Sequence, residues 1–384
     1  MPHAILSPDA VERALALRDL TDPAQGPHAM QVLVGAASGA LEKAWGCPVH
    51  LERSHPVVTV ADNYDALLYP PGGAARDARY TRYVSRDTLL RTQTSAMIPP
   101  LLRRLAAAPP ADVLLACPGL VWRRDRIDRL HVGEPHQLDR WRLRRGPDLA
   151  GRDLDEMVAL VAAAVAPGRA VRVERTVHPY TAGGLEVHVE VGGEWVEVAE
   201  CGVAHPLLLR ACGLPEDVSG LAMGLGLDRL LMIAKGIDDI RLIRSEDPRV
   251  AAQMLDLAPY RPVSSHPPIR RDLSIAVGEW AVAEEIGDRV REALGERAAD
   301  VEAIEVLSET WAAALPAPAR ERLGMGTGQK NVVVRITLRV GEGPPHGAEA
   351  NRLRDLVYAA IHEGSRAEWA CGAPPARASL ARVG

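Results

Sequence analysis

The strongest constraint on the fold is a series of strand-like segments in the middle of the chain, where β-branched residues alternate with polar ones. Three segments have this pattern: VRVERTV (171–177), LEVHVEV (185–191) and EWVEVAE (194–200). Gly192 and Gly193 separate the last two segments, and such a pair is typical of the tight turn in an antiparallel hairpin. A helical segment, DLDEMVALVAAAVA (153–166), precedes them. The pattern predicts an antiparallel sheet flanked by helices.

Neighbouring segments extend this sheet into a domain that we expect over residues 49–258. Two of them, separated by a charged loop, predict an antiparallel pair: ADVLLACPGLVWRRD (111–125) and HQLDRWRLRR (136–145). LAMGLGLDRLLMIAKG (221–236) predicts a glycine-bearing strand that runs into a helix ending at Gly236. Residues 1–48 predict a helical N-terminal segment.

The C-terminal third predicts a second domain. Prolines mark a linker over residues 259–268, and the segments of residues 269–384 follow in the order strand, helix, strand, strand, helix. This order resembles a ferredoxin-like βαββαβ unit. The whole chain is therefore expected to be an α+β protein of two domains.

Composition excludes several classes of protein. With 384 residues, of which 47% are hydrophobic, the chain can form at least two cores, which excludes a disordered chain or a small disulfide scaffold. Five cysteines without a CxxC pair favour a reducing compartment over zinc binding. The N-terminus lacks the pattern of a signal peptide, and no apolar run approaches the roughly 18 residues of a membrane span, so we expect a cytoplasmic protein with no membrane partner. A net charge of -5 gives no general attraction to nucleic acid.

The chain contains no phenylalanine, although seven tryptophans and seven tyrosines remain. It has 42 arginines but three lysines, so a GC-rich codon bias is one explanation. Selection against phenylalanine itself is the other hypothesis.

Two arginines on separate elements are suited to a polyphosphate ligand. Arg123 lies in an Arg-rich, His-containing segment (118–141), and Arg229 stands at the start of a predicted helix in GLGLDR (224–229). A guanidinium group never deprotonates and can stabilise charge that develops at phosphorus. A helix amino terminus adds its own positive end. A tight strand-to-helix turn without a ligand is the alternative reading of GLGLDR.

Two glutamates on neighbouring predicted strands, Glu186 and Glu197, could hold Mg²⁺ through oxygen ligands. Alternating glutamates are also typical of a solvated strand face, and the sequence does not decide between the two.

Six segments, in this order, closely resemble the catalytic domain of class II phenylalanyl-tRNA synthetases. They are NYDALLYP (63–70), LLRTQTSAM (89–97), residues 118–141, HPYTAGGLEVHVE (178–190), EWVEVAECGVAHP (194–206) and residues 219–247. The C-terminal segments HPPIRRDLSIAV and GQKNVVVRITLR resemble the ferredoxin-fold anticodon-binding domain of this family. The direct fusion of the two is similar to the single-chain mitochondrial form. The resemblance covers about residues 50–372 and implies the class II antiparallel sheet flanked by helices, plus a C-terminal ferredoxin-like domain.

For the nucleotide, the resemblance implies that Arg123 binds the α-phosphate of ATP and Arg229 the γ-phosphate. His131 would lie near the triphosphate, with a surface histidine of no function as the alternative. Gly224 and Gly226 would let the backbone approach the adenine or the substrate. ATP and Mg²⁺ are the expected cofactors.

For the amino acid, the resemblance implies a binding site for its ammonium and carboxylate end and a pocket for its ring. The first group is Gln93, Thr94, Ser95, Gln137 and Asp139. The family has glutamate where this chain has Asp139, so the carboxylate here is a methylene shorter. Ala222 would form the floor of the ring pocket.

The ring pocket departs from the family. Where the family has Phe-Pro-Phe, this chain has His178, Pro179 and Tyr180, whose polar groups need partners when buried. Such a pocket could hold phenylalanine or a hydroxylated, heteroaromatic or otherwise polar side chain. Tyr64 and Met223 also stand at family phenylalanine positions.

In the C-terminal domain, a stripe of basic residues at strand starts or along one strand could face tRNA phosphates. The residues are Arg270, Arg271, Lys330, Arg335 and Arg339. A solvated sheet face is the alternative.

The leading interpretation is an ATP-dependent ligase that activates phenylalanine or a related aromatic amino acid and transfers it to tRNA, with tRNA-Phe expected. Two alternatives remain: an adenylating ligase that delivers to a carrier protein or small amine, and a non-catalytic tRNA-binding regulator. The protein could work as a monomer or a homodimer.

Overall fold

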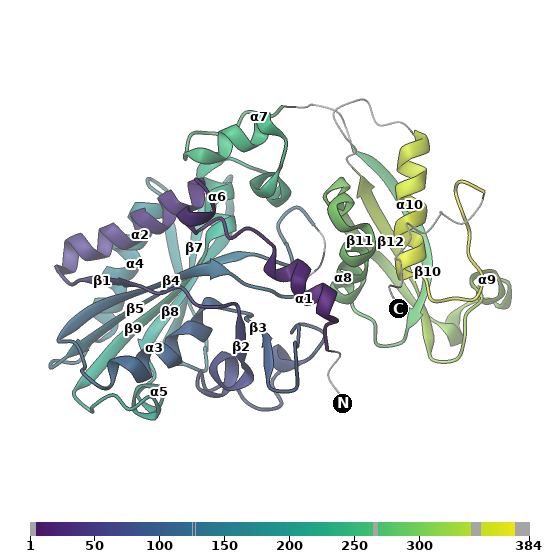
Figure 1. Ribbon diagram of the computed structural model, residues 1–384. Helices are drawn as coiled ribbons and strands as arrows, with labels where there is room; N and C mark the ends of the chain where they lie inside the picture. The colour runs from purple at the N-terminus through teal and green to yellow at the C-terminus, as the bar shows by residue number, and fades with distance from the viewer. Residues whose placement is uncertain (1–4, 125, 127, 264–267, 339–346, 373–384) are drawn as a thin grey trace. The chain divides into compact units, whose positions relative to one another are not determined.

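The computed structural model describes residues 5–124, 126, 128–263, 268–338 and 347–372 (Figure 1). The chain divides into two compact units. Unit 1 contains Met1–Arg123 and Glu134–Arg261, and unit 2 contains Arg124–Gly133 and Pro262–Gly384. The boundaries expected from the sequence, including the separation of residues 1–48, stay predictions. Within the described ranges, no helix has both the length and the apolar character needed to cross a membrane.

Unit 1 is built on a seven-stranded sheet in the order β1-β4-β5-β9-β8-β7-β6, to which a two-stranded sheet of β2 and β3 is added. The strands are β1 (Val49–Leu51), β2 (Val57–Thr59), β3 (Thr88–Leu90), β4 (Asp112–Leu120), β5 (His136–Arg145), β6 (Val171–Arg175), β7 (Thr181–Val191), β8 (Glu194–Ala204) and β9 (Val218–Gly226). In the large sheet only β1 and β4 run parallel. The expected antiparallel sheet is therefore confirmed.

Helices flank this sheet, as Figure 1 shows. The helices of unit 1 are α1 (Pro8–Leu15), α2 (Ala29–Trp45), α3 (Ile98–Leu105), α4 (Gly151–Val165), α5 (Pro206–Ala211), α6 (Leu227–Lys235) and α7 (Pro248–Ala251). Arg140 of β5 donates to the Ala37 carbonyl of α2, so this helix covers the face to which Arg140 points. Because side chains alternate along a strand, Asp139 and Trp141 point to the other face. We call that other face the site face.

The predicted hairpin turn, helix end and strand pair of unit 1 are confirmed. Gly192 and Gly193 have φ values of 62° and 90°, which suit the two-residue turn between β7 and β8. Helix α6 ends at Gly236, whose φ of 66° is a left-handed conformation that glycine adopts without strain. The strand pair predicted over 111–125 and 136–145 is the antiparallel pair β4 and β5.

Unit 2 contains the expected strands and helices in the expected order, but a short additional helix, α9, lies between its second and third strands. Its elements are β10 (Ile269–Gly278), α8 (Ala283–Leu294), β11 (Val301–Trp311), α9 (Ala317–Leu323), β12 (Gln329–Leu338) and α10 (Gly347–Ile361). The antiparallel sheet has the order β10-β12-β11. In the described part of the chain no further strand follows α10, so the last strand of the ferredoxin-like unit stays a prediction.

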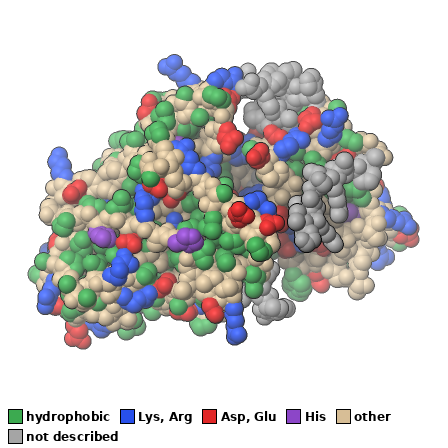
Figure 2. All heavy atoms as spheres, in the orientation of Figure 1, with side chains coloured by type: hydrophobic (Ala, Val, Ile, Leu, Met, Phe, Trp, Pro, Cys, Tyr) green, Lys and Arg blue, Asp and Glu red, His purple; other side chains and the backbone are tan. Residues whose placement is uncertain are grey.

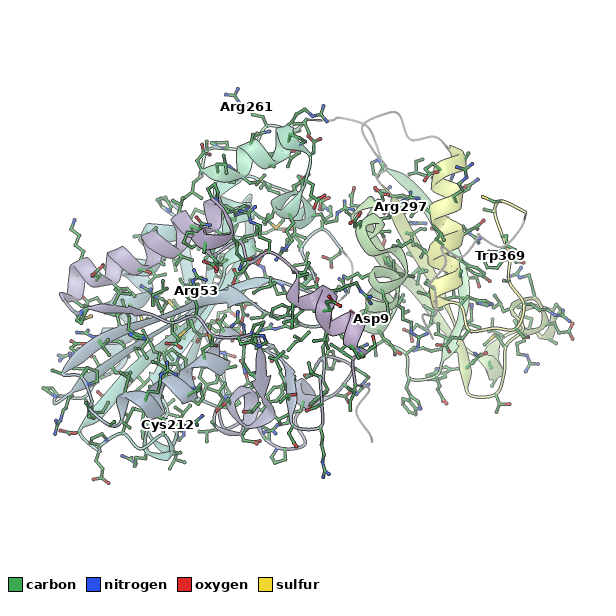
Figure 3. All side chains as sticks on the ribbon, in the orientation of Figure 1. Asp9, Arg53, Cys212, Arg261, Arg297 and Trp369 are labelled. Carbon is green, nitrogen blue, oxygen red and sulfur yellow. The ribbon has the colours of Figure 1, made fainter. Side chains whose placement is uncertain are left out.

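Helices α8 and α10 form the core of unit 2 against one face of this sheet. Ile286 and Val290 of α8 and Leu353 and Val357 of α10 are spaced four residues apart and are buried in one apolar cluster. Trp369, labelled in Figure 3, packs edge-on against Tyr358 of this cluster with ring centroids 5.7 Å apart.

Candidate active site

Strand register brings several chemically active side chains into one row on the site face. Asp139 of β5 lies opposite Gly224 of β9, which lies opposite Glu200 of β8. Glu200 lies opposite Glu186 of β7, which lies opposite Glu174 of β6. Directly opposite residues have Cβ atoms about 5 Å apart. The row therefore joins a buried carboxylate at one end to a group of glutamates at the other.

The middle of this row is open. A Cβ atom placed on Gly224, or on Gly226 in the next row, would meet no atom of the described residues within 4 Å. By contrast, a Cβ atom on Gly202 of β8 would come within 2.6 Å of Thr181. Close packing against Thr181 therefore requires a glycine at position 202, but no contact within the described residues requires one at position 224 or 226. The free space above them is where a ligand could approach the backbone.

The residues expected at the ammonium end of the amino acid do come together. Thr94 and Ser95 both donate from their hydroxyl groups to Oδ2 of Asp139, at 2.8 Å. The Trp141 indole donates to Oδ1 at 3.2 Å. Asp139 is only 2% exposed, and burial raises its pKa to about 6 although these hydrogen bonds oppose the shift. The carboxylate is thus preorganised and desolvated.

Two amides complete this end of the site. Gln137 accepts a hydrogen bond from the Thr94 backbone at 3.3 Å. Gln93 donates to the Asn63 carbonyl at 3.0 Å and accepts from the Tyr69 hydroxyl at 3.1 Å. These contacts hold the segment before α3 against β5.

An aromatic cluster borders Asp139. The Tyr180 ring, which is buried, lies between Tyr69, Trp141 and His178, with centroid distances of 6.3, 6.1 and 6.2 Å. Ala222 lies directly opposite Trp141 on β9, so its small side chain leaves room for the indole. The sequence indicated Tyr180 and His178 but not Tyr69 or Trp141. The role of Ala222 as a pocket floor stays a prediction.

His178 forms an ion pair that the sequence did not indicate. Its Nε2 atom lies 3.2 Å from Oε2 of Glu200. Glu200 raises the pKa of His178, and His178 together with Arg123 lowers the pKa of Glu200. Each group therefore favours the charged form of the other.

The two predicted phosphate-binding arginines come from different elements of unit 1. Arg123 follows β4, and its Nε donates to the Thr92 carbonyl at 2.6 Å. Its charge also acts on Tyr69, opposing the burial that raises the pKa of that phenol to about 12. Arg229 lies in the first turn of α6 and donates to the Glu197 carbonyl at 2.8 Å. Neither guanidinium group is fully buried, so both can accept a further anionic partner.

His131 is held within its own segment. Its Nδ1 lies 2.8 Å from both carboxylate oxygens of Asp128. Its role near the triphosphate stays a prediction.

The glutamates offer donors for a divalent cation, in a grouping that differs from the expected pair. The donor atoms of Glu174, Glu186 and His188 all lie within 4.8 Å of one another. The buried Nδ1 atom of His188 has no hydrogen-bond partner among the described residues. Glu197 lies opposite His188, but its carboxylate is 3.5 Å from Arg229. Oxygen donors of this kind fit Mg²⁺, and Glu186 is the expected ligand that belongs to the three-residue group.

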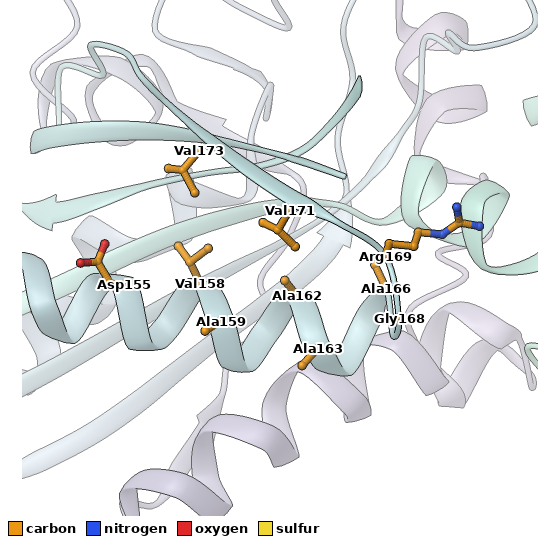
Figure 4. Close-up of a pocket in the computed structure, with 10 residues that line it drawn as sticks. All are labelled: Asp155, Val158, Ala159, Ala162, Ala163, Ala166, Gly168, Arg169, Val171 and Val173. Carbon is orange, nitrogen blue, oxygen red and sulfur yellow. The ribbon is translucent and has the colours of Figure 1, made fainter. Parts of the chain in front are cut away.

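The groove in Figure 4 lies away from this chemistry. It has a volume of about 440 Å³ and runs between α4 and β6. Its lining includes Val171 and Val173, which alternate with Glu174 on β6 and so point to the opposite face of the sheet.

The basic residues expected to bind tRNA do not form one stripe. Lys330 is 6% exposed and pairs with Glu309 at 2.8 Å, and Arg335 forms two hydrogen bonds with Asp272. Arg270 and Arg271 are adjacent in β10 and therefore point to opposite faces. Arg339 lies outside the described residues. Acidic and basic side chains are interspersed on the face shown in Figure 2, and tRNA binding by these residues stays a prediction.

Comparison with known proteins agrees with this site. The family model described as "tRNA synthetases class II core domain (F)" matches residues 50–254, which include the whole row on the site face. The chain therefore belongs to the class II tRNA synthetase family.

Its relatives include phenylalanine--tRNA ligases. The alpha subunit of Prochlorococcus marinus (strain MIT 9313) is 34% identical over 238 residues, which are 61% of this chain and 69% of that protein. The chloroplastic/mitochondrial enzyme of Arabidopsis thaliana is 30% identical over 268 residues, 66% of this chain and 61% of that protein. A solved pyrrolysyl tRNA synthetase of Desulfitobacterium hafniense has a TM-score of 0.44 at 20% identity, covering 60% of this chain and 77% of that one. The resemblance to phenylalanyl-tRNA synthetases is confirmed, and the chain spans roughly half to two thirds of such relatives.

Proposed function

We propose that this protein activates an aromatic amino acid with ATP and transfers it to tRNA. The observation that carries the proposal is the arrangement of charge around an open stretch of backbone. Asp139, a buried carboxylate, lies on one side of Gly224, while the exposed groups of Arg123 and Arg229 supply positive charge nearby. The ammonium group of an amino acid needs a negatively charged partner and the triphosphate of a nucleotide needs positively charged ones, and their reaction requires the two next to each other.

The proposed chemistry needs no protein nucleophile. Asp139 binds the ammonium group and directs the substrate carboxylate towards ATP. A carboxylate oxygen attacks the α-phosphorus, the bond to pyrophosphate breaks, and pyrophosphate leaves with the bond electrons. Arg123 stabilises the charge that develops at the α-phosphorus, and Arg229 holds the distal phosphates. A terminal ribose hydroxyl of tRNA then attacks the acyl carbon, and AMP leaves.

Mg²⁺, when bound, would neutralise phosphate charge. Glu186 and Glu197 stay the proposed carboxylates, and Glu174 and His188 offer further donors beside Glu186. Unit 2 is proposed to bind tRNA. A cytoplasmic location stays a prediction, because the name of the Arabidopsis relative places that protein in chloroplasts and mitochondria.

The test is ATP–pyrophosphate exchange across the twenty standard amino acids and their hydroxylated aromatic analogues, for the wild type and for Arg123→Ala and Arg229→Ala. We expect exchange with aromatic amino acids and a loss of about 100-fold or more in kcat/KM for each variant. Arg145→Ala is the matched control, because Arg145 pairs with Asp217 on the surface and should leave exchange unchanged. Exchange with none of these amino acids would contradict the proposal.

A further inference from the structure

His178 is a buried donor without a hydrogen-bond acceptor. The residue is 9% exposed, and its buried Nε2 atom makes no hydrogen bond within the described part of the chain. The nearest carboxylate, that of Glu200, is at ion-pair distance but not in hydrogen-bonding geometry. The ion pair with Glu200 offsets part of the cost of burying the imidazole, but a buried N–H group without a hydrogen bond is still costly, so it indicates a ligand that supplies an acceptor.

The imidazole is fixed in its place. Its ring stacks on Tyr180 with an interplanar angle of 29°. On its other side, a Cβ atom on Gly184 would come within 2.9 Å of Nδ1, so only glycine leaves room for the ring there. The Nε2 atom consequently stays beside Glu200, whose neighbour in the row is Gly224 with open space above it.

We propose that His178 selects the side chain of the activated amino acid and that the substrate is an aromatic amino acid carrying a hydroxyl group. The hydroxyl oxygen accepts from Nε2 of His178, and the hydroxyl hydrogen is donated to Glu200. A hydroxyl group can do both at once, which matches a donor and an acceptor 3.2 Å apart that do not satisfy each other. Glu200 therefore contacts the substrate and also holds the His178 imidazole by the ion pair. This inference rests on the function proposed above.

The surroundings favour a ring as the carrier of that hydroxyl group. The Tyr180 ring stacks on His178 with centroids 6.2 Å apart, and the Tyr69 ring lies 6.3 Å beyond Tyr180. The ring of an aromatic substrate packs well against other aromatic rings. An unsubstituted ring would leave the buried Nε2 atom of His178 without an acceptor, and sites built to bond a hydroxyl group discriminate strongly against analogues that lack it.

The test measures kcat/KM in ATP–pyrophosphate exchange with the full chain for phenylalanine, tyrosine, meta-tyrosine and 3,4-dihydroxyphenylalanine. We expect at least one hydroxylated substrate to be preferred over phenylalanine by roughly 10- to 100-fold. His178→Phe should remove or reverse that preference, mainly through KM. His178→Gln, which keeps an N–H donor, should retain part of it and serves if His178→Phe does not fold.

His50→Phe is the matched control. His50 is an exposed residue of β1 that lies 3.2 Å from Glu52 just after the strand, so the same substitution there should leave the preference unchanged. Phenylalanine preferred by the wild type, or a hydroxyl preference that survives His178→Phe, would overturn the inference and leave the proposed function intact. If neither the standard amino acids nor the hydroxylated analogues support exchange, both the proposed function and this inference are overturned.

Discussion

Replacing Asp139 by asparagine should stabilise the protein and impair its activity, two effects of opposite sign from one substitution. The carboxylate is 2% exposed, and burial raises its pKa from 3.8 to about 6. A difference of about two pH units corresponds to about 3 kcal/mol, which the folded state loses when the group is ionised. Asparagine removes this cost because it carries no charge.

The sign of the pH dependence follows from the same values. Below pH 3.8 the carboxyl group is protonated in the folded and the unfolded state, so its ionisation costs the folded state nothing. Above about pH 6 it is charged in both states, and only the folded state has to bury the charge. The stabilisation by Asp139→Asn is therefore fully present above about pH 6 and disappears as the pH falls towards 3.8.

The hydrogen bonds reduce this gain. Thr94 and Ser95 now donate to a carboxylate, and with asparagine they would accept from a neutral amide, a loss of roughly 1 kcal/mol. The net gain should be about 1–2 kcal/mol, or roughly 4 °C in Tm at pH 7.5. Loss of the charged partner for the substrate ammonium should raise KM for the amino acid by about 10- to 100-fold.

The assay pairs thermal unfolding at pH 7.5 and pH 4.5 with ATP–pyrophosphate exchange. Asp112→Asn is the control, because Asp112 forms a two-bond pair with Arg142 on the neighbouring strand and should lose stability without losing exchange. A lower Tm for Asp139→Asn at pH 7.5, or an unchanged KM, would refute the reasoning.

Three further outcomes are expected. Gly224→Val should fold with unchanged Tm, because its Cβ atom meets open space, but it should lose exchange, because the side chain fills the space of the ligand. Melting followed by circular dichroism and exchange kinetics measure the two effects, and a normally active variant would count against the site. Tyr64→Phe should lower the free energy of unfolding in urea by about 1 kcal/mol, because the buried hydroxyl bonds to the Ala75 carbonyl and to Thr81. Removal of divalent cations with EDTA should abolish exchange and added Mg²⁺ should restore it, whereas exchange that persists in EDTA would exclude the metal.

The sequence was sufficient for the elements that have strong local signals. Alternation of apolar residues indicated β6, β7 and β8, and the glycine pair at 192 and 193 indicated their hairpin, because backbone conformation at these positions is decided by neighbouring residues. Thr94, Ser95 and Asp139, which the family resemblance grouped, also meet in the structure, and their role at the ammonium end stays a prediction.

The sequence could not indicate Glu200 as a site residue, because its position depends on how β7 and β8 pair. Strict alternation would place Glu197 and Glu200, three residues apart, on opposite faces of β8. A shift in pairing beside His188 inserts one extra residue, so both glutamates lie opposite residues of the site face. No local pattern marks this bulge. Glu200 was missed for that reason.

Pairing between strands that are distant in sequence also determines which basic side chains are neutralised by an acidic neighbour. Lys330 was expected to face phosphates, but Glu309 of the adjacent strand neutralises it, and only the strand pairing reveals this partner. The aromatic contact of Trp141 with Tyr180 likewise joins a residue of β5 to the residue that precedes β7, which is distant in sequence.

The central claim is that the activated amino acid is transferred to tRNA, and a direct charging assay tests it. The purified full chain is incubated with total tRNA, ATP, Mg²⁺ and the amino acid that gives the fastest exchange, and the acylated tRNA is then isolated and sequenced. We predict that one tRNA species becomes acylated and that Arg123→Ala abolishes the product. Rapid pyrophosphate exchange without any acylated tRNA would contradict the claim and favour delivery to another acceptor.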